Sequence, residues 1–387
     1  MSDTAELSIV LPCLNEADTV GICVEKALRA MRERAIAGEV IVADNGSTDG
    51  SREIAQRLGA RVVAVAERGY GHALLAGIAA ARAPFVVMAD SDDSYDLLEA
   101  PRFLDKLREG AEIVQGCRLP SGGGRVLPGA MPWLHRRLGN PLFSWMVRRW
   151  FRAPIHDVYC GLRGFRKDFC DSLDLRCTGL EFATEMIIKA SLRRARFAEV
   201  PITLHPDGRR AHAPHLKTFR DGWRTLRFFL VYSPRWLFLI PGAVLIALAL
   251  AGYAIALPGL RIGGVAFDVH TLLFASLAAI CGYQSILFAV FTKVFAMTEG
   301  LLPPDERLEP FCREGNLERG LVAGALAAAA GVALLFGAVE QWRATRFGPL
   351  DYSHTMRWVI PGVTLTALGF QTVLSSFFLS VLGLKRR

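Results

Sequence analysis

Two aspartates separated by one residue, Asp90 and Asp92, follow a short apolar run at 85–89. Carboxylates in this arrangement can chelate Mg²⁺ or Mn²⁺ and leave coordination positions open for the oxygens of a diphosphate. A metal held in this way stabilises the negative charge that grows on a departing nucleoside diphosphate. Isolated pairs of this kind are common in turns, so the position of the pair in the fold decides between a turn and a metal site.

Polar side chains also follow two earlier apolar runs, at 7–11 and 40–43. The first run leads into the sequence PCLNE and the second into DNGSTDG, and neither contains the glycine pattern of a dinucleotide-binding turn. A dinucleotide-binding fold is therefore disfavoured, and phosphate charge must be neutralised by other means.

The apolar runs alternate with stretches of helical periodicity, which indicates an α/β fold with a mostly parallel sheet covered on both faces. Ligands of such sheets bind beyond the carboxyl ends of the strands, and the polar residues lie at those ends. This placement favours a metal site over a turn for Asp90 and Asp92. We expect strands at 7–11, 40–43, 61–66, 85–89 and 112–115, and helices from about 18 and at 50–58, 72–81 and 97–108.

The 387-residue chain is 52% hydrophobic with a mean hydropathy of +0.29, and its net charge is +8. The positive charge suits an anionic membrane surface or phosphorylated ligands. Nucleic acid is a less favoured partner, because no basic run interleaved with aromatic residues occurs in the soluble part of the chain. The eight cysteines show neither a C-x-x-C pair nor zinc-ligand spacing, so we expect no structural zinc and no disulfide framework.

Four segments near the C-terminus meet the requirement of roughly 20 apolar residues for a membrane-spanning helix. They lie at 237–257, 272–291, 320–339 and 358–384. Basic, aromatic amphipathic segments at 215–232 and 141–151 have the pattern of helices that lie in a membrane interface, although an ordinary amphipathic core helix has a similar pattern. The predicted domains are a catalytic domain at 1–214, an interfacial helix at 215–235 and a membrane domain at 236–387.

The polar start of the chain shows no signal peptide, so we expect the first domain to be cytoplasmic. Four crossings then return the tail, Lys385 to Arg387, to the same side, together with the loop at 296–318 and the arginines Arg307, Arg313 and Arg319. Arginines at 341–357 on the opposite side weaken the charge bias. The third segment, rich in Gly and Ala, is suited to close packing with a neighbour, so a homo-oligomer remains open.

As a set, the sequences LPCLNE, VADNGSTDGS, RGYGHALLAGIAAA and VVMADSDDSYD resemble the motifs of family 2 glycosyltransferases with the GT-A fold. The later sequences QGCRL, HDVYCGLRGFRK, LEFATEM and EVPITL resemble the polyprenyl-phosphate sugar transferases of that family. The resemblance spans residues 7 to about 235, and the four apolar segments suit the bacterial type. It implies a nucleotide sugar as donor, a polyprenyl phosphate lipid as acceptor, Mg²⁺ or Mn²⁺ as cofactor and a bacterial inner membrane location.

By position, the resemblance assigns Pro12, Asn15, Glu16 and Asp44 to the nucleoside, and Asp90 and Asp92 to the metal. Arg118 would face a donor or acceptor phosphate, and Arg137 would belong to a loop over the acceptor phosphate. Asp157 would be a base or a second metal contact, or alternatively a helix cap or a partner of Arg163. Glu185 would touch the sugar or pair with an arginine. Tyr159 departs from the family pattern, which leaves the sugar contacts open.

The reaction implied is an in-line attack of the lipid phosphate on the anomeric carbon, with inversion. The phosphate is already ionised at neutral pH, so positioning and charge neutralisation matter more than a strong base. UDP-glucose is the favoured donor and GDP-mannose the second. A processive polysaccharide synthase is the nearest alternative, but its Q-x-x-R-W motif is absent around Arg235. A membrane scaffold or flippase with a degenerate sugar-binding domain is another, and the acidic cluster argues against it.

Overall fold

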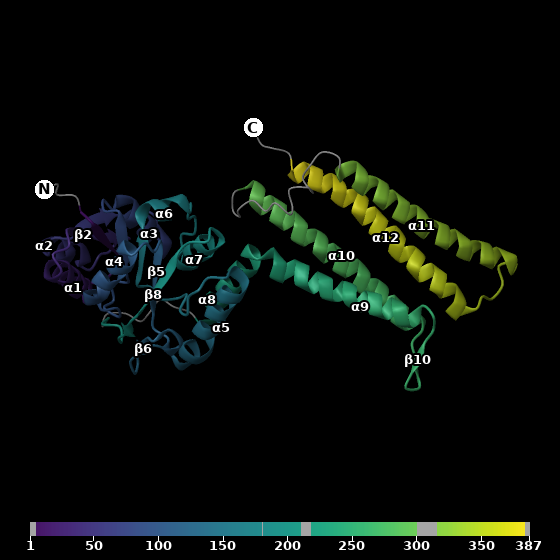
Figure 1. Cartoon of the computed structure of the whole chain (residues 1–387), viewed down its shortest axis with the longest axis horizontal. Coiled ribbons are helices and arrows are strands. Elements are labelled where there is room, and N and C mark those ends of the chain that lie inside the picture. Colours follow the sequence, from purple (N-terminus) through teal and green to yellow (C-terminus); the bar gives the residue numbers. More distant parts are fainter. Residues whose placement is uncertain (1–4, 180, 210–217, 300–315, 384–387) are drawn as a thin grey trace. The chain divides into compact units, whose positions relative to one another are not determined.

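The computed structural model describes residues 5–179, 181–209, 218–299 and 316–383. The chain divides into two compact units, Met1–Phe229 and Leu230–Arg387 (Figure 1). The division falls inside one helix, between the two domain boundaries expected from the sequence. The expected interfacial residues 215–217, most of the loop at 296–318 with Arg307 and Arg313, and the tail at 385–387 lie outside the described residues.

The first unit is built on a seven-stranded sheet in the order β3-β2-β1-β4-β7-β5-β8. Neighbouring strands are parallel except at β7, which runs antiparallel to both β4 and β5. The predicted α/β class with a mostly parallel sheet is thus confirmed. The strands are β1 (Leu7–Cys13), β2 (Gly38–Asp44), β3 (Arg61–Ala64), β4 (Phe85–Met88), β5 (Ile113–Cys117), β7 (Arg163–Arg166) and β8 (Phe197–Pro201).

Helices cover both faces of this sheet because alternate side chains of each strand point to opposite sides. Leu7, Ile9 and Leu11 of β1 share one core with the apolar sides of α1 and α4. Val10, between them, faces Gly77 of α3, where the missing side chain allows the helix to approach the strand closely. The helices are α1 (Val20–Glu33), α2 (Ser51–Arg57), α3 (Tyr70–Ala80), α4 (Ala100–Arg108), α5 (Asn140–Phe151), α6 (Lys167–Ser172), α7 (Phe182–Leu192) and α8 (Thr218–Tyr232).

Two short strands bring a distant part of the chain to the edge of the site. β6 (Arg125–Val126) pairs in parallel with β9 (Thr203–Leu204), and Leu204 also forms a single bridge with Tyr95 in the loop after β4. The segment that follows β9 therefore runs beside the Asp90–Asp93 loop. Residues separated by more than 100 positions in the sequence meet there.

Helix α5 has one buried side and one exposed side, as expected for the amphipathic segment at 141–151. Val147 and Phe151 are buried, whereas Leu142 and Trp145 are 45% and 51% exposed. Phe229 of α8 is fully buried and packs its ring against Phe151, with centroids 6.0 Å apart, and against the rings of Phe143 and Trp150. Phe229, the last residue of the first unit, thus packs against α5.

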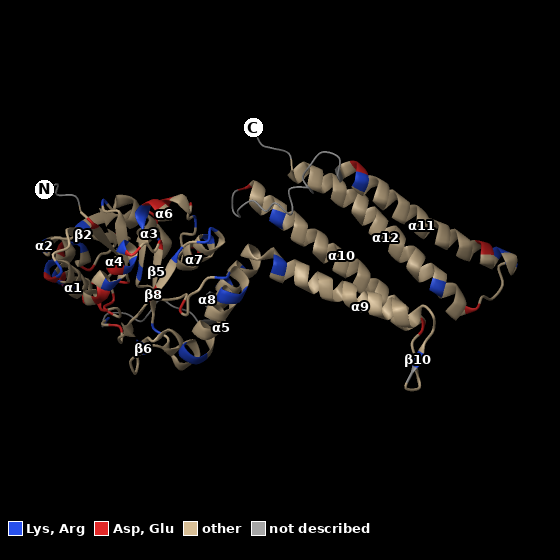
Figure 2. Cartoon of the chain, viewed as in Figure 1, with Lys and Arg blue, Asp and Glu red and all other residues tan. Residues whose placement is uncertain are grey.

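Among the described residues, the second unit contains four helices that are long and apolar enough to cross a membrane, at Arg235–Ala256, Val269–Thr298, Leu317–Ala344 and Tyr352–Leu382. Figure 2, in which the ribbon is coloured by charge, shows the charged residues of these helices toward the helix ends. They confirm the four predicted segments and extend most of them by several residues. The helical elements are η4 (Arg235–Leu239), α9 (Ile240–Ala256), α10 (Val269–Thr298), α11 (Asn316–Ala344) and α12 (Tyr352–Leu382), and the hairpin β10 (Arg261–Ile262) and β11 (Val265–Ala266) joins α9 to α10.

Glycines of α11 pack against α12 of the same chain. A methyl group built on Gly324 would lie 2.8 Å from the carbonyl oxygen of Gly369, and one built on Gly369 would lie 2.6 Å from that of Gly324. Gly331 approaches Gly362 in the same way. The small residues that left a homo-oligomer open thus make close contacts inside one chain, and the oligomeric state stays a prediction.

Hydrogen bonds between side chains add to the packing of the second unit. The Tyr253 hydroxyl lies 2.6 Å from Ser276 Oγ and 3.0 Å from Thr364 Oγ1, which joins α9, α10 and α12. At the start of α10, Asp268 accepts a hydrogen bond from Arg357 of α12 at 3.0 Å. One of the arginines expected on the outer side is therefore paired with a carboxylate.

Candidate active site

Asp90 lies two residues beyond β4 and is held by a tyrosine. Its Oδ1 accepts a hydrogen bond from the Tyr70 hydroxyl at 2.9 Å. A methyl group built on Gly161 would lie 2.7 Å from its Oδ2, so the backbone there closely approaches the carboxylate. Burial and then the charge of Asp92 raise the pKa of Asp90 to about 6, although the Tyr70 hydrogen bond opposes the shift. Asp90 is therefore harder to ionise than an exposed aspartate.

Asp92 is 8% exposed, and its carboxylate has two partners. Oδ1 accepts a hydrogen bond from the Ser94 amide at 3.0 Å, and Oδ2 lies 3.3 Å from Nη1 of Arg209. The next residue, Asp93, is turned toward α1, where it pairs with Lys26 at 2.8 Å. Asp93 is therefore paired on the α1 side of the loop, apart from Asp90 and Asp92, the two predicted metal ligands.

Glu16 follows β1 and is held by the same arginine. Nη2 of Arg209 lies 2.7 Å from Glu16 Oε1, and Nε donates to both carboxylate oxygens at 2.9 Å. The Glu16 amide donates to Ser51 Oγ at 2.9 Å. Arg209 therefore joins the ends of β1 and β4, with Glu16 only 6% exposed.

The ends of β1 and β2 form one hydrogen-bonded edge. Asp44 is fully buried and accepts hydrogen bonds from the amides of Gly46 and Ser47, at 3.1 and 3.2 Å, and from Arg52. Asn15, in the left-handed region at φ +59°, accepts from the Thr48 amide at 2.9 Å. Asp44 thus shapes the loop after β2, and this loop in turn positions Asn15.

Pro12 contributes its backbone rather than its ring to this edge. Its carbonyl oxygen accepts a hydrogen bond from Ser91 Oγ at 2.6 Å, and Ser91 lies between Asp90 and Asp92. The loops after β1 and β4 are therefore tied together. The structure thus brings Pro12, Asn15, Glu16, Asp44, Asp90 and Asp92 to one end of the sheet.

Asp157 and Arg118 form a buried, two-pronged ion pair. Arg118 Nε donates to Asp157 Oδ2 at 2.7 Å and Nη2 donates to Oδ1 at 2.9 Å. The Arg118 amide also donates to Oδ2, and Nη1 lies 3.3 Å from the Tyr95 hydroxyl, which accepts from the Gly161 amide. With Asp157 fully buried and both oxygens bonded, this geometry suits positioning of Arg118 and of the Gly161 backbone beside Asp90.

Arg163 is not the partner of Asp157, which was the alternative from the sequence. It stands opposite Gln115 in the pairing of β7 with β5, and its Nε donates to Gln115 Oε1 at 2.6 Å. Its other donors reach the carbonyl oxygens of Ala183 and Val158. Burial lowers the pKa of Arg163 to about 10. This guanidinium connects β7, the loop before it and α7.

Glu185, on α7, is fully buried, and its carboxylate contacts residues of α7 and of the loop before this helix. Its Oε2 accepts hydrogen bonds from the amides of Arg176 and Cys177, at 3.0 and 2.8 Å, and Lys189 Nζ lies 2.8 Å from Oε1. The loop held in this way accepts a hydrogen bond from the Gly71 amide at Thr178. The Glu185 carboxylate therefore supports the loop that packs against the Tyr70 turn, rather than standing open toward a sugar.

Arg137 is exposed and lies apart from these clusters, in the π-helical turn His135–Gly139 before α5. This surface side chain forms no hydrogen bond or ion pair with the loop Asp90–Asp93, here called the acidic loop, or with another described element. The predicted site residues thus comprise a connected set at the sheet edge, the Asp157–Arg118 pair beside Asp90, Glu185 on α7, and this separate arginine.

The residues present fit a divalent cation that shares its coordination with a substrate. Among the described residues, no group of three His, Cys, Asp or Glu side chains is suited to hold a metal ion alone. Mg²⁺ is usually bound by one or two carboxylates together with waters and substrate phosphates. Asp90 and Asp92 supply that number of carboxylates, all through hard oxygen donors.

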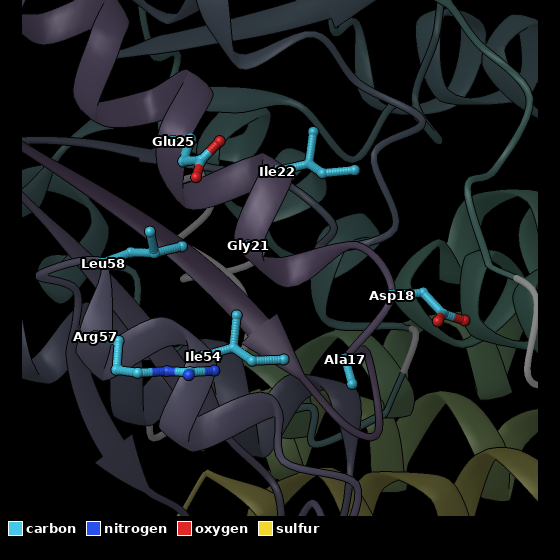
Figure 3. A pocket seen from close by; sticks show the side chains of 8 residues that line it. All are labelled: Ala17, Asp18, Gly21, Ile22, Glu25, Ile54, Arg57 and Leu58. Carbon is cyan, nitrogen blue, oxygen red and sulfur yellow. The ribbon is translucent and has the colours of Figure 1, made fainter.

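A hollow of about 310 Å³ lies beside this site but does not include it. Figure 3 shows its lining, which comes from α1, the residues just before it and α2. Ile22, Ile54 and Leu58 make it partly apolar, and Glu25 and Arg57 stand at its margin. It contains neither the acidic loop nor Arg118, so we do not assign the reaction to it.

The sequence interpretation missed several residues that hold the site together. Tyr70 lies in the GYG sequence, which by its spacing is a weak signal for phosphate binding. Arg209 follows the EVPITL stretch, and two of its acidic partners, Glu16 and Asp92, are more than 100 residues away. Only the pairing of β9 beside the acidic loop brings them together.

Comparison with known proteins identifies the class. Residues 8–173 match the model of glycosyl transferase family 2, and residues 290–383 match the glycosyltransferase family 2 C-terminal transmembrane region. Over 379 residues the chain is 35% identical to the low-salt glycan biosynthesis hexosyltransferase Agl6 of Haloferax volcanii, covering 97% of this chain and 89% of that protein. The chain belongs to glycosyltransferase family 2, and its C-terminal helices make it a multi-pass membrane protein.

A second relative from Haloferax volcanii is a dolichyl-phosphate hexose transferase, 34% identical over 218 residues, which are 56% of this chain and 89% of that protein. Among solved structures, the chain resembles glucosyl-3-phosphoglycerate synthase from Mycobacterium tuberculosis in complex with Mn²⁺, UDP and glucosyl-3-phosphoglycerate. That match is 22% identical with a TM-score of 0.44, and it covers 59% of this chain and 78% of the other. The predicted resemblance to family 2 is confirmed.

Proposed function

We propose that this glycosyltransferase moves a hexose from a nucleoside-diphosphate sugar to a polyprenyl phosphate, forming a polyprenyl-phosphate sugar with inversion at the anomeric carbon. UDP-glucose is the favoured donor and GDP-mannose the second. The observation that carries the proposal is the pair Asp90 and Asp92 at the end of β4, in a chain that also carries membrane-spanning helices. The name of the dolichyl-phosphate hexose transferase relative supports the acceptor class.

On the donor side, the loops after β1 and β2 would receive the nucleoside, with Asp44 fixing the loop that positions Asn15. Asp90 and Asp92 would hold Mg²⁺ or Mn²⁺, which when bound offsets the charge of the leaving diphosphate. Tyr70 orients the Asp90 carboxylate, and Asp157 orients Arg118. These contacts set the position of charged groups before the substrate arrives, which is how a preorganised site lowers a barrier.

On the acceptor side, the lipid phosphate needs little help from a base, since its second pKa is about 6. The exposed Arg137 is suited to bind such a phosphate through the forked donors of its guanidinium. It lies on the same segment as an exposed apolar stripe formed by Trp133, Leu138, Leu142 and Trp145, of which Trp133 is 72% exposed. Exposed aromatic and aliphatic side chains beside arginines are typical of a membrane-interface surface.

We further propose that the catalytic domain lies on the cytoplasmic side of a bacterial inner membrane. Nucleotide sugars would then be accessible to it, and the four predicted membrane crossings agree with this orientation. The stripe of α5 and the preceding turn would rest at the headgroup level. In this arrangement the lipid phosphate reaches the domain without leaving the bilayer.

The experiment is a panel of radiolabelled nucleotide sugars tested with the full-length protein, polyprenyl phosphate and Mn²⁺. We expect one lipid-linked hexose as product, from UDP-glucose before GDP-mannose. Asp92→Asn removes one predicted ligand charge and should abolish transfer, whereas Asp168→Asn, in an exposed ion pair with Arg166, is the matched control. Full transfer by Asp92→Asn would refute the metal assignment, and a polymeric product would indicate a processive synthase.

A further inference from the structure

The guanidinium of Arg209 lies among three carboxylates. Besides its bonds to Glu16, its Nη1 lies 3.3 Å from Asp92 Oδ2 and 3.3 Å from Asp207 Oδ2. The Arg209 side chain is only 16% exposed. A single cation thus balances part of a concentrated negative charge, and one of its partners is a predicted metal ligand.

The position of Arg209 is fixed by the backbone around it. The Gly208 amide donates to the carbonyl oxygen of Asp92 at 2.9 Å, and the His205 amide donates to that of Ser94 at 3.0 Å. A methyl group built on Gly208 would lie 3.0 Å from Thr19 Cγ2 and 3.5 Å from the Asp92 carbonyl oxygen, so this segment closely approaches both the start of α1 and the Asp90–Asp93 loop. Arg209 is therefore built into the site, unlike a long surface side chain that pairs by chance.

A divalent cation and this guanidinium compete for the same oxygen. A metal bound by Asp90 and Asp92 would stand next to Arg209, and like charges at such distances repel strongly in a partly buried site. Arg209 therefore disfavours binding of a free metal ion. When the metal arrives with a diphosphate, two further phosphate charges enter, and a guanidinium binds phosphate oxygens in pairs.

We propose that Arg209 is an internal counter-ion of the acidic loop, which holds Asp92 until the donor enters and then pairs with the donor diphosphate. Metal and nucleotide then bind together, and the metal alone binds weakly. This inference rests on the proposed metal-dependent use of a nucleotide sugar. In thermodynamic terms, Arg209 couples the two binding events, so each ligand raises the affinity for the other by the same factor.

The test measures Mn²⁺ binding to the full-length protein in detergent, without nucleotide and with UDP or GDP. Binding is followed by calorimetry and by the loss of the electron paramagnetic resonance signal of free Mn²⁺. For Arg209→Gln we expect Mn²⁺ alone to bind about tenfold more tightly than to the wild type, because a charge at contact distance is removed. The factor by which UDP or GDP improves Mn²⁺ binding should fall accordingly. Arg209→Lys keeps the charge and should bind Mn²⁺ alone much as the wild type does.

Two controls separate the possible failures. Arg61→Gln removes the same charge from an ion pair with Glu39 at β3 and should leave Mn²⁺ binding unchanged. If Mn²⁺ binds the wild type with UDP or GDP, Asp92→Asn abolishes that binding, and Arg209→Gln leaves the affinity for Mn²⁺ alone unchanged, the counter-ion role is refuted while the proposed function stands. If the wild type shows no Asp92-dependent binding of Mn²⁺ with either nucleotide, the proposed function fails, and the counter-ion role fails with it.

Discussion

Replacement of Asp157 by asparagine tests whether the buried pair with Arg118 holds the loop that approaches Asp90. The substitution keeps the shape of the side chain and one oxygen acceptor, but it removes the charge that balances the guanidinium. Asp157 is fully buried and Arg118 is 7% exposed, so water cannot replace the lost partner. The variant therefore leaves a buried arginine without its counter-ion.

The cost follows from that burial. Removing one partner of a buried ion pair destabilises a protein by about 3–5 kcal/mol. Because asparagine retains one acceptor, we expect the lower end, about 3 kcal/mol, which is more than a hundredfold in the opening equilibrium. Replacing both charges, in Arg118→Met with Asp157→Asn, should recover much of the loss, since no uncompensated charge is then left buried.

The assay follows the labelling of Cys117 and Cys160 in the full-length protein by a thiol reagent and mass spectrometry. Both side chains are fully buried, and burial raises the pKa of the Cys117 thiol to about 12, so the native thiol is protected. Labelling then requires opening of this region, and its rate reports the free energy of opening when closing is fast. We expect Asp157→Asn to be labelled more than about a hundredfold faster than the wild type.

The control for this experiment is Asp168→Asn, which breaks the exposed pair with Arg166 and should change the opening free energy by less than about 1 kcal/mol. If Asp157→Asn were labelled no faster than this control, the pair would not carry the stability that its burial implies. Equal labelling of the single and double variants would likewise refute the charge argument, since the loss would then come from shape.

Three further variants probe the site and its surroundings. Tyr70→Phe removes a hydrogen bond that favours ionised Asp90, whose pKa is about 6. Mn²⁺ binding needs the ionised carboxylate, so it should weaken below that pH. When Mn²⁺ binding is titrated against pH, the midpoint should be shifted upward in the variant. Gly161→Ala displaces the Asp90 carboxylate, so transfer should fall about tenfold or more while the melting temperature is kept. Trp145→Glu should raise the KM for polyprenyl phosphate in nanodiscs about tenfold, with the donor KM unchanged.

Each of these outcomes has a clear opposite. An unchanged pH midpoint in Tyr70→Phe would separate the hydroxyl from the Asp90 ionisation. Normal transfer by Gly161→Ala would show that the close approach of this backbone is not needed. An equal rise of both KM values in Trp145→Glu would point to a general defect of the domain rather than to loss of a membrane contact.

The sequence predicted the sheet edge well because its signals are local. Each of the runs ending near Pro12, Asp44 and Asp90 is apolar for several residues and then abruptly polar, which marks a buried strand and its loop. The carboxyl ends of parallel strands meet, so the grouping of these residues needed no knowledge of distant contacts. The same reasoning located the four apolar helices, since length and hydropathy suffice.

The partners of the charged residues were beyond such reasoning. Asp157 pairs with Arg118 because the register of β5 and β7 sets Gln115 opposite Arg163 and so occupies the competing arginine. Strand direction is also invisible to periodicity, and β7 was not expected between β4 and β5. The link between Arg209 and Glu16, 193 residues apart, depends wholly on tertiary structure.

The close approach of α11 and α12 has a consequence for the surrounding lipid. Where Gly324 meets Gly369 and Gly331 meets Gly362, the two backbones leave no room for even one methyl group. An acyl chain therefore cannot enter between α11 and α12 at these contacts, and the two helices face the surrounding lipid as one packed surface. Lipid tails must then contact the outward flanks of the two helices, where large side chains such as Phe336 and Phe370 are exposed.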